Sequence, residues 1–243
     1  MLRIISDFSN GYVILLSMKR EKRHWKNFSS LSALAGIIGP ILFFLVMTLA
    51  GLLRPGYSAM AEPGSNLGVG YNSWIMNSNF FLSGVLFVIS AVGFYSDMRG
   101  VIKRTVWRTL AALLLVLPGI GLINEGFFAT DLPGFPPTTL HGVLHIIGFF
   151  VIFLDLIFAP IIIGILLWKT SFWRNYSIYS ILTGLLLTPL SIVFLFYTTS
   201  HIPQISGFAE RLLIGVTFLW YAVTHASRLV SSSSYPGLQK KTL

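Results

Sequence analysis

The sequence is unusually apolar for its length. Of its 243 residues, 54% are hydrophobic and only 10% are charged, and the mean hydropathy is +0.77. A soluble globular protein carries about a quarter charged residues, so the composition excludes that class and indicates a membrane protein. The absence of cysteine excludes disulfides, thiol nucleophiles and zinc thiolates, so any metal ion would need His and carboxylate ligands.

Six windows are long and apolar enough to cross a bilayer as helices, which takes about 20 residues each. In chain order they cover Leu31–Leu53, Trp74–Ser96, Val106–Phe127, Leu140–Trp168, Tyr176–Thr199 and Phe208–Val230. Prolines inside the windows are tolerated because neighbouring helices satisfy the freed backbone groups, and Pro160 is expected to bend the long fourth helix. We predict an all-α bundle of six transmembrane helices at 31–230, with a basic tail at 1–30 and a flexible tail at 231–243.

The basic residues predict the orientation of the bundle. With both termini in the cytoplasm, the cytoplasmic segments hold 15 of the 17 Lys and Arg residues, and the outer face keeps Arg54 and Arg211. This is the positive-inside pattern, and we expect a multi-pass protein of the cell membrane. The formal net charge of +9 is therefore a topology signal, and no nucleic-acid partner is expected.

The first 30 residues are expected to form a disordered or interfacial cytoplasmic tail. The apolar stretch Tyr12–Met18 is too short to span a bilayer, and no small-residue cleavage site follows it. Five basic residues between Lys19 and Lys26 are expected to contact anionic lipid headgroups. Translation starts at Met1 or at Met18; the sequence leaves both open.

Polar residues of the outer half gather near the helix ends. Asn79, Glu125, His141 and His145 fall within a turn or two of those ends, so we predict a polar cavity that opens outward. The other residues expected to bind substrate or support the structure there are Arg54, Tyr57, Glu62, His201 and Arg211. Glu210 lies in the first turn of the sixth helix, where it complements the helix dipole.

The stretch TDLPGFPPTTLHGVLH, residues 130–145, carries most of the functional argument. The prolines after Asp131 predict a stiff, extended turn, and Thr138 or Thr139 is expected to cap the next helix. His141 and His145 are four residues apart and therefore share one face of that helix.

Three hypotheses account for this histidine pair. In the first, His141 and His145 bind a divalent metal such as zinc, with a third ligand from Asp131, Glu125, Glu62 or His201; the catalytic Glu of an H-E-x-x-H motif is absent. In the second, a His acts with Asp131 or Glu125 in acid–base catalysis. In the third, both His residues only form interhelical hydrogen bonds.

Asp155 is expected near the middle of the membrane, where an ionised carboxylate is costly without a partner. At 1.5 Å per residue, Asp155 and His225 lie about 22 Å and 25 Å from the outer ends of their helices. We predict that these two side chains approach one another. The alternative is a protonated Asp155 bonded to a carbonyl or hydroxyl group.

Several segments resemble one membrane family, known as domain of unknown function 998. They are the run from Gly36 to Gly84, which contains RPGYS, the segment FFATDLPGFPPTTLHGVLH, and AERLLIGVTFLWYAVTHASRL, so the likeness covers 31–230. Family members typically have Phe-Pro-x-Asp where this chain has Phe128-Ala129-Thr130-Asp131. The resemblance implies a multi-pass bacterial or archaeal membrane protein and assigns no activity. The chain is also loosely similar to intramembrane hydrolases of the alkaline ceramidase type, which is an analogy only.

The sequence leaves the activity open. The leading expectation is a membrane protein with an outward-facing polar cavity that hydrolyses a lipid or lipid-linked substrate by metal assistance or general-base catalysis, with Asp131, His141, His145 and Glu125 as candidates. The alternatives are a small-molecule or proton-coupled transporter that uses Asp155 and His225, and a non-catalytic membrane scaffold.

Overall fold

The computed structural model describes residues 2–132, 136–199 and 203–234, and these ranges contain helices, turns and no β-strand. Six long helices dominate: α1 (Leu2–Leu53), α2 (Ser73–Asp97), α3 (Thr105–Phe127), α4 (Leu140–Leu167), α5 (Arg174–Thr199) and α6 (Ser206–Ser234). Four short 3₁₀ helices lie between them: η1 (Gly64–Gly68), η2 (Met98–Gly100), η3 (Ser171–Trp173) and η4 (Pro203–Ile205). The predicted six-helix, all-α fold is confirmed.

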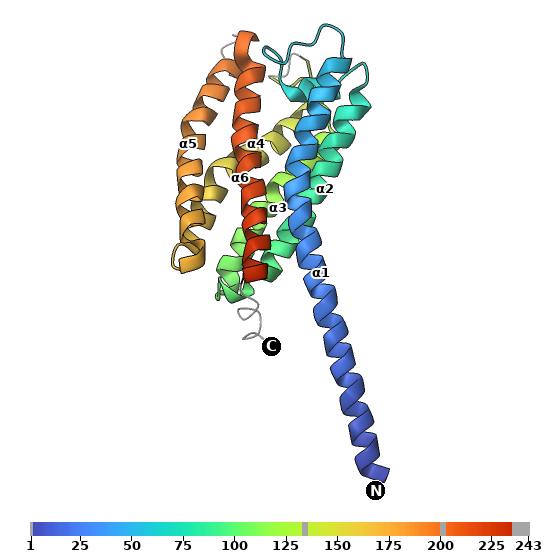
Figure 1. The fold of residues 1–243 in the computed structure, drawn as a ribbon. Coiled ribbons are helices and arrows are strands. Elements are labelled where there is room, and N and C mark those ends of the chain that lie inside the picture. The colour runs from blue at the N-terminus through green and yellow to red at the C-terminus, as the bar shows by residue number, and fades with distance from the viewer. Residues whose placement is uncertain (1, 133–135, 200–202, 235–243) are drawn as a thin grey trace.

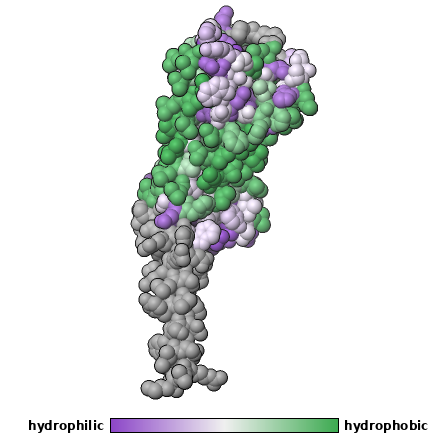
Figure 2. All heavy atoms as spheres, turned by 90° about the vertical axis from the view of Figure 1, so that its right-hand side faces the viewer, coloured by the Kyte–Doolittle hydropathy of each residue, from purple (hydrophilic) through white to green (hydrophobic). Residues whose placement is uncertain are grey.

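The six spans lie close to where the hydropathy places them. Each long helix contains a segment apolar enough to cross a membrane, beginning with Asn27–Leu53 and ending with Ser206–Ser231. Leucine, isoleucine and phenylalanine side chains cover the outside of the bundle, among them Leu45 and Leu52. Figure 2 shows the resulting hydrophobic band, with hydrophilic residues at both ends of the bundle. An exterior of this kind suits hydrocarbon, so the chain is a multi-pass membrane protein.

The helices form a closed ring. Each packs against the next one along the chain, and α6 packs back against α1 (Figure 1). At the centre, the Tyr221 hydroxyl of α6 lies 3.0 Å from the carbonyl oxygens of Phe87 on α2 and Leu115 on α3, and 2.8 Å from Ser90 Oγ. These contacts hold three helices together inside the membrane, where a polar group without a partner is costly.

The N-terminal segment is helical. Helix α1 begins at Leu2 and continues without a break into the first span, and it extends away from the bundle (Figure 1). No proline precedes Pro40, and Lys, Arg and Glu are strong helix formers, so the basic segment continues the helix. Helix α6 likewise continues into the predicted C-terminal tail, to Ser234, and residues 235–243 lie outside the described ranges.

The beginning of α1 and the end of α6 lie at the same end of the bundle, as an even number of spans requires (Figure 1). The segment that contains η1 lies at the opposite end, together with the ends of α3 and α5 and the starts of α4 and α6. We call this end the outer end, following the charge asymmetry; the assignment of the two ends to the two sides of the membrane stays a prediction.

Candidate functional site

A small cavity lies inside the ring, close to its outer end. All six long helices contribute to its wall, and Gly64 and Ser65 of η1 cover it. Its volume is about 50 Å³, enough for a few water molecules. Most of the wall is apolar, and its two acidic members are Glu125 of α3 and Glu210 of α6.

Glu125, which lines this cavity, lies close to His145 of α4. The carboxylate oxygen Oε2 of Glu125 lies 3.8 Å from Nε2 of His145, and the two residues are only 6% and 5% exposed. On the other side of the imidazole ring, Nδ1 lies 2.9 Å from the carbonyl oxygen of Phe128. A carbonyl can only accept, so Nδ1 carries the proton, and Nε2 of the neutral ring is free to accept one. The distance of 3.8 Å is too long for a direct hydrogen bond, so the two groups are close without being hydrogen-bonded.

Glu210 reaches the same cavity from the first turns of α6. Its carboxylate accepts a hydrogen bond from the backbone N–H of Gly64, which is 146 positions away in the sequence. The turn that supplies this N–H is fixed by Arg54, whose guanidinium donates to the carbonyl oxygens of Asn66, at 2.8 Å, and of Val69. Arg54 therefore supports the cover of the cavity from outside the cavity wall.

Tyr57 and Arg211 join the first outer loop to α6. Arg211 donates to the carbonyl oxygens of Ala59 and Glu62, at 2.8 and 3.0 Å, and to the Tyr57 hydroxyl. The Tyr57 hydroxyl also lies 3.0 Å from the carbonyl oxygen of Glu62, and desolvation raises the pKa of this phenol. The Glu62 carboxylate accepts from the backbone N–H of Ser58 at 3.0 Å and is thus occupied within the loop.

Asp131 holds the N-terminus of α4. Its carboxylate accepts from the backbone N–H groups of Thr138 and Thr139, at 2.6 and 2.8 Å, and from the Thr139 hydroxyl at 2.7 Å. The hydrogen bonds from Thr139 and Thr138 lower the pKa of Asp131 to about 2. Thr139 Oγ1 in turn accepts from the N–H of Gly142 at 3.0 Å, which confirms the predicted cap. The contacts of Asp131 are those of a structural carboxylate.

The structure separates the two histidines of the HGVLH segment. His145 is buried beside Glu125, whereas His141 is exposed and packs edge-on against Phe128, with 5.5 Å between the ring centroids. In the part of the chain that the structure describes, no group of three or more His, Asp or Glu side chains could hold a metal ion. His201, one of the candidate third ligands, lies outside the described residues. Among the described residues, no third ligand joins His141 and His145, and the zinc site stays a prediction.

Asn79 of α2 is buried and serves the packing of α1. Its amide nitrogen donates to the carbonyl oxygen of Phe43 at 2.9 Å, and its oxygen lies 3.3 Å from Ser83 Oγ. Both Phe43 and Met76, which also contacts the Asn79 amide, line the cavity, so Asn79 positions two parts of the wall.

Asp155 and His225 are not joined by a hydrogen bond. His225 Nδ1 lies 2.7 Å from a guanidinium nitrogen of Arg228, one turn further along α6, and its Nε2 has no partner among the described residues. Asp155 is 4% exposed, and its Oδ1 also lacks a partner there. The similar depths of Asp155 and His225 along their helices suggested a contact between them and gave no sign of the contact between His225 and Arg228.

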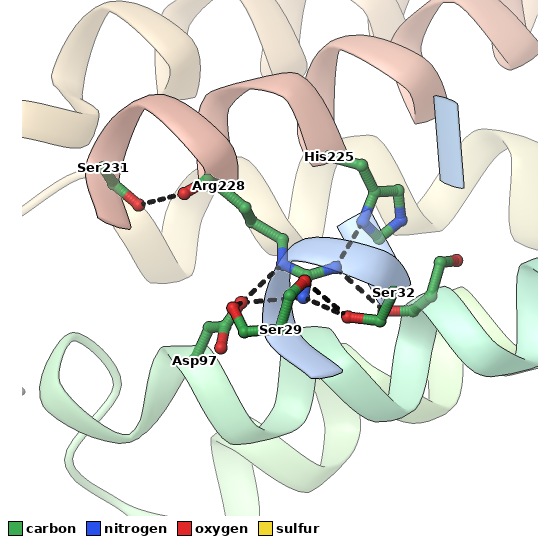
Figure 3. Close-up of polar contacts among 7 residues, drawn as sticks. Ser29, Ser32, Asp97, His225, Arg228 and Ser231 are labelled. Carbon is green, nitrogen blue, oxygen red and sulfur yellow. Dashed lines mark hydrogen bonds and ion pairs between the residues drawn. The ribbon is translucent and has the colours of Figure 1, made fainter. Parts of the chain in front are cut away.

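Arg228 is the centre of a buried cluster at the other end of the bundle (Figure 3). Its guanidinium bonds to Asp97 Oδ2 of α2, at 2.7 Å, and to Ser32 Oγ of α1, at 3.0 Å. Asp97 also accepts from Ser29 Oγ at 2.9 Å, so the cluster connects α1, α2 and α6.

Sequence reasoning missed two features of this arrangement. For Glu210, the sequence predicts only an interaction with the dipole of its own helix. A Glu followed by the apolar run of a membrane span is itself a signal of a functional carboxylate. For Arg228, the sequence predicts only a place among the basic residues on the cytoplasmic side. An Arg just before the end of a span, with a Ser three residues later, gives little warning of its burial.

Comparison with known proteins identifies the family. The family model described as "Protein of unknown function (DUF998)" matches residues 37–227, which include all the cavity residues and most of the six spans. Comparison with curated proteins gave no match, and comparison with solved structures gave none either. Because the match covers well over half of the chain, the protein is a member of the DUF998 family.

Proposed function

We propose that this membrane protein is a hydrolase that acts on a lipid or lipid-linked substrate, with His145 as the general base and Glu125 as its partner. The observation that carries the proposal is the buried pair of Glu125 and His145 beside a cavity with room for a few water molecules. A catalytic base must lie within reach of the proton it takes, directly or through one water, and we propose that a water in the cavity beside Glu125 lies within reach of His145 Nε2.

The chemistry follows from the state of the imidazole ring. His145 Nε2 takes a proton from a water molecule while the water oxygen bonds to the carbonyl carbon of an ester or amide. The resulting imidazolium then gives this proton to the leaving oxygen or nitrogen, and the bond to the leaving group breaks. Glu125 stabilises the imidazolium, because opposite charges attract strongly where water is scarce. The Phe128 carbonyl holds the ring in the required tautomer.

The position of the cavity supports a lipid substrate. Glu125 is two residues from the end of α3 and Glu210 four residues from the start of α6, so the site lies only about 3–6 Å inside the helix ends. A headgroup at the membrane surface reaches this depth while the acyl chains remain in the bilayer.

The test measures product release from lipid vesicles that contain the purified protein. Wild type is expected to release fatty acid or headgroup, identified by mass spectrometry, and His145→Gln is expected to lower the rate by about 10²–10⁴-fold, as for loss of a general base. Glu125→Gln is expected to lower it less, since it removes the partner and not the base.

His141→Gln is the matched control, because it changes a histidine on the same helix that is exposed and outside the cavity. Its rate is expected to equal that of wild type. Loss of activity in both histidine variants, together with bound zinc, would favour the metal hypothesis instead. Absence of hydrolysis from the whole lipid extract would contradict the proposal and favour the transporter or scaffold alternatives.

A further inference from the structure

The wall of the cavity is rich in aromatic rings. Six phenylalanines from five helices line it: Phe43, Phe80, Phe149, Phe153, Phe194 and Phe218. The rings pack on one another, with centroid distances of 5.1 Å between Phe43 and Phe218 and 5.8 Å between Phe149 and Phe194. The face of an aromatic ring carries partial negative charge and attracts cations.

The two acidic residues of the wall have neither Lys nor Arg beside them in that wall. No Lys or Arg is among the described residues that line the cavity. Arg211 follows Glu210 in the sequence. Its guanidinium, however, forms hydrogen bonds with Ala59, Glu62 and Tyr57 in the loop between α1 and α2.

Glu125 has no Lys or Arg beside it among the residues that line the cavity. It is 6% exposed and lines the cavity, and its carboxylate accepts no hydrogen bond from the described residues; His145 at 3.8 Å is its polar neighbour. A buried carboxylate without a donor is unfavourable unless a proton or a cation compensates it. This carboxylate, which accepts no hydrogen bond from the described residues, and the surrounding rings are independent features, and both favour a positively charged ligand.

We propose that the cavity binds the positively charged amine of a membrane amphiphile, with Glu125 and Glu210 facing the ammonium group and the phenylalanine rings around its carbon atoms. This inference rests on the proposed function, since it names the substrate class of the same site. The cavity volume of about 50 Å³ suits a small ammonium group and excludes an acyl chain, which stays in the bilayer. The site therefore selects lipids by the charge of the headgroup.

The experiment compares three amphiphiles of one chain length on the full chain in a non-ionic detergent. Dodecylammonium is the probe, and dodecanol and dodecanoate are its neutral and anionic counterparts. Dodecylammonium is expected to raise the unfolding temperature saturably, as a ligand of the folded state does, and the other two are not. Equal stabilisation by dodecanol would overturn the inference, because it would show that the chain alone binds.

Variants locate the binding site. Glu125→Gln/Glu210→Gln keeps the shape of both side chains, and it is expected to weaken dodecylammonium binding by at least about tenfold through loss of the charge pairing. Glu62→Gln is the matched control, since that carboxylate bonds to Ser58 in the outer loop and does not line the cavity. Unchanged affinity in the double variant would contradict the inference. If this variant fails to fold, the comparison of the three amphiphiles on wild type decides the question.

The same probe separates this inference from the proposed hydrolysis. His145→Gln is expected to lose turnover and to keep binding dodecylammonium. Binding without hydrolysis in any lipid mixture would leave the amine site standing and refute the hydrolase. Hydrolysis that depends on His145, without binding of dodecylammonium, would support the hydrolase and refute the amine site.

Discussion

Asp131 illustrates how a residue that looks catalytic in the sequence can be structural. It precedes a turn rich in proline and lies near two histidines, which suggested a ligand or a base. Its carboxylate instead accepts hydrogen bonds from Thr138 and Thr139 at the start of α4. A carboxylate at this position satisfies free N–H groups and complements the helix dipole.

Replacement of Asp131 is therefore expected to reduce stability. Asp131→Asn removes the negative charge and part of the accepting capacity, and the unfolding temperature at pH 7 is expected to fall by about 2–4 °C, as for loss of one helix cap. Intrinsic tryptophan fluorescence during heating measures this in detergent. Hydrolysis, scored on the protein that remains folded, is expected to be unaffected; its complete loss would contradict a structural role.

The pH dependence of this effect follows from the pKa. The pKa of Asp131 in the folded protein is about 2, below the ordinary value of 3.8. Its contribution to stability is therefore fully present above pH 3.8 and disappears as the pH falls through about 2. The difference between wild type and Asp131→Asn is expected to be constant from pH 7 to pH 5 and to shrink below pH 4.

At the scale of the helices, α2 and α3 approach one another through small residues. A Cβ atom added to Gly84 would lie 2.6 Å from the carbonyl oxygen of Gly119, and one added to Gly119 would lie 2.8 Å from that of Gly84. Close contact of backbones drives helix association in membranes, where the hydrophobic effect contributes little between helices. The two glycines thus set the distance between α2 and α3, and Glu125 is carried on α3.

Gly84→Ala is expected to force α2 and α3 apart at a cost of about 1–3 kcal/mol, because backbone atoms cannot move aside like a flexible side chain. Unfolding by titration with sodium dodecyl sulfate measures the change. Gly215→Ala in α6 is the control, since its added Cβ would meet Phe44 at an ordinary 3.7 Å, and it is expected to be neutral or slightly stabilising. Equal effects of the two substitutions would show that the close contact is not important.

At the scale of the whole molecule, different polar contacts join the helices at the two ends of the ring. At the outer end, Glu210 and Arg211 of α6 bind the loop that covers the cavity. At the other end, Arg228 of α6 binds Asp97 of α2 and Ser32 of α1, in the cluster of Figure 3. These contacts join segments more than 100 positions apart in the chain, so they fix the ring as one unit.

Breaking the inner cluster is expected to destabilise the whole bundle. The Arg228 side chain is 0% exposed, and Asp97 faces it at 2.7 Å, so Arg228→Met leaves a largely buried carboxylate without its partner, which costs about 3–5 kcal/mol. The double variant Arg228→Met/Asp97→Leu removes both charges and is expected to recover part of this loss. Detergent unfolding of wild type, Arg228→Met, Asp97→Leu and the double variant forms a double-mutant cycle. Additive losses would contradict the assigned ion pair.

The sequence by itself determined the membrane class, the six spans and the cap of α4. Each of these depends on local chemistry: about 20 apolar residues are needed to cross a bilayer, and a Thr after a proline-rich turn caps the helix that follows. It also identified Glu125 and His145 as candidates, because ionisable residues are rare in this chain and their positions near helix ends are read directly from the order of residues.

Only the tertiary structure decided which of the polar residues act together. The choice of helix neighbours buries His145, one turn deeper than the exposed His141 on the same face of α4, brings Glu210 to the cavity of Glu125, and places Arg228 within hydrogen-bonding distance of His225. Depth along a helix follows from counting residues, but lateral packing depends on contacts between segments far apart in the chain, such as the close approach of Gly84 and Gly119. Those non-local contacts are what turn six apolar helices into a ring in which Glu125 and His145 are buried side by side.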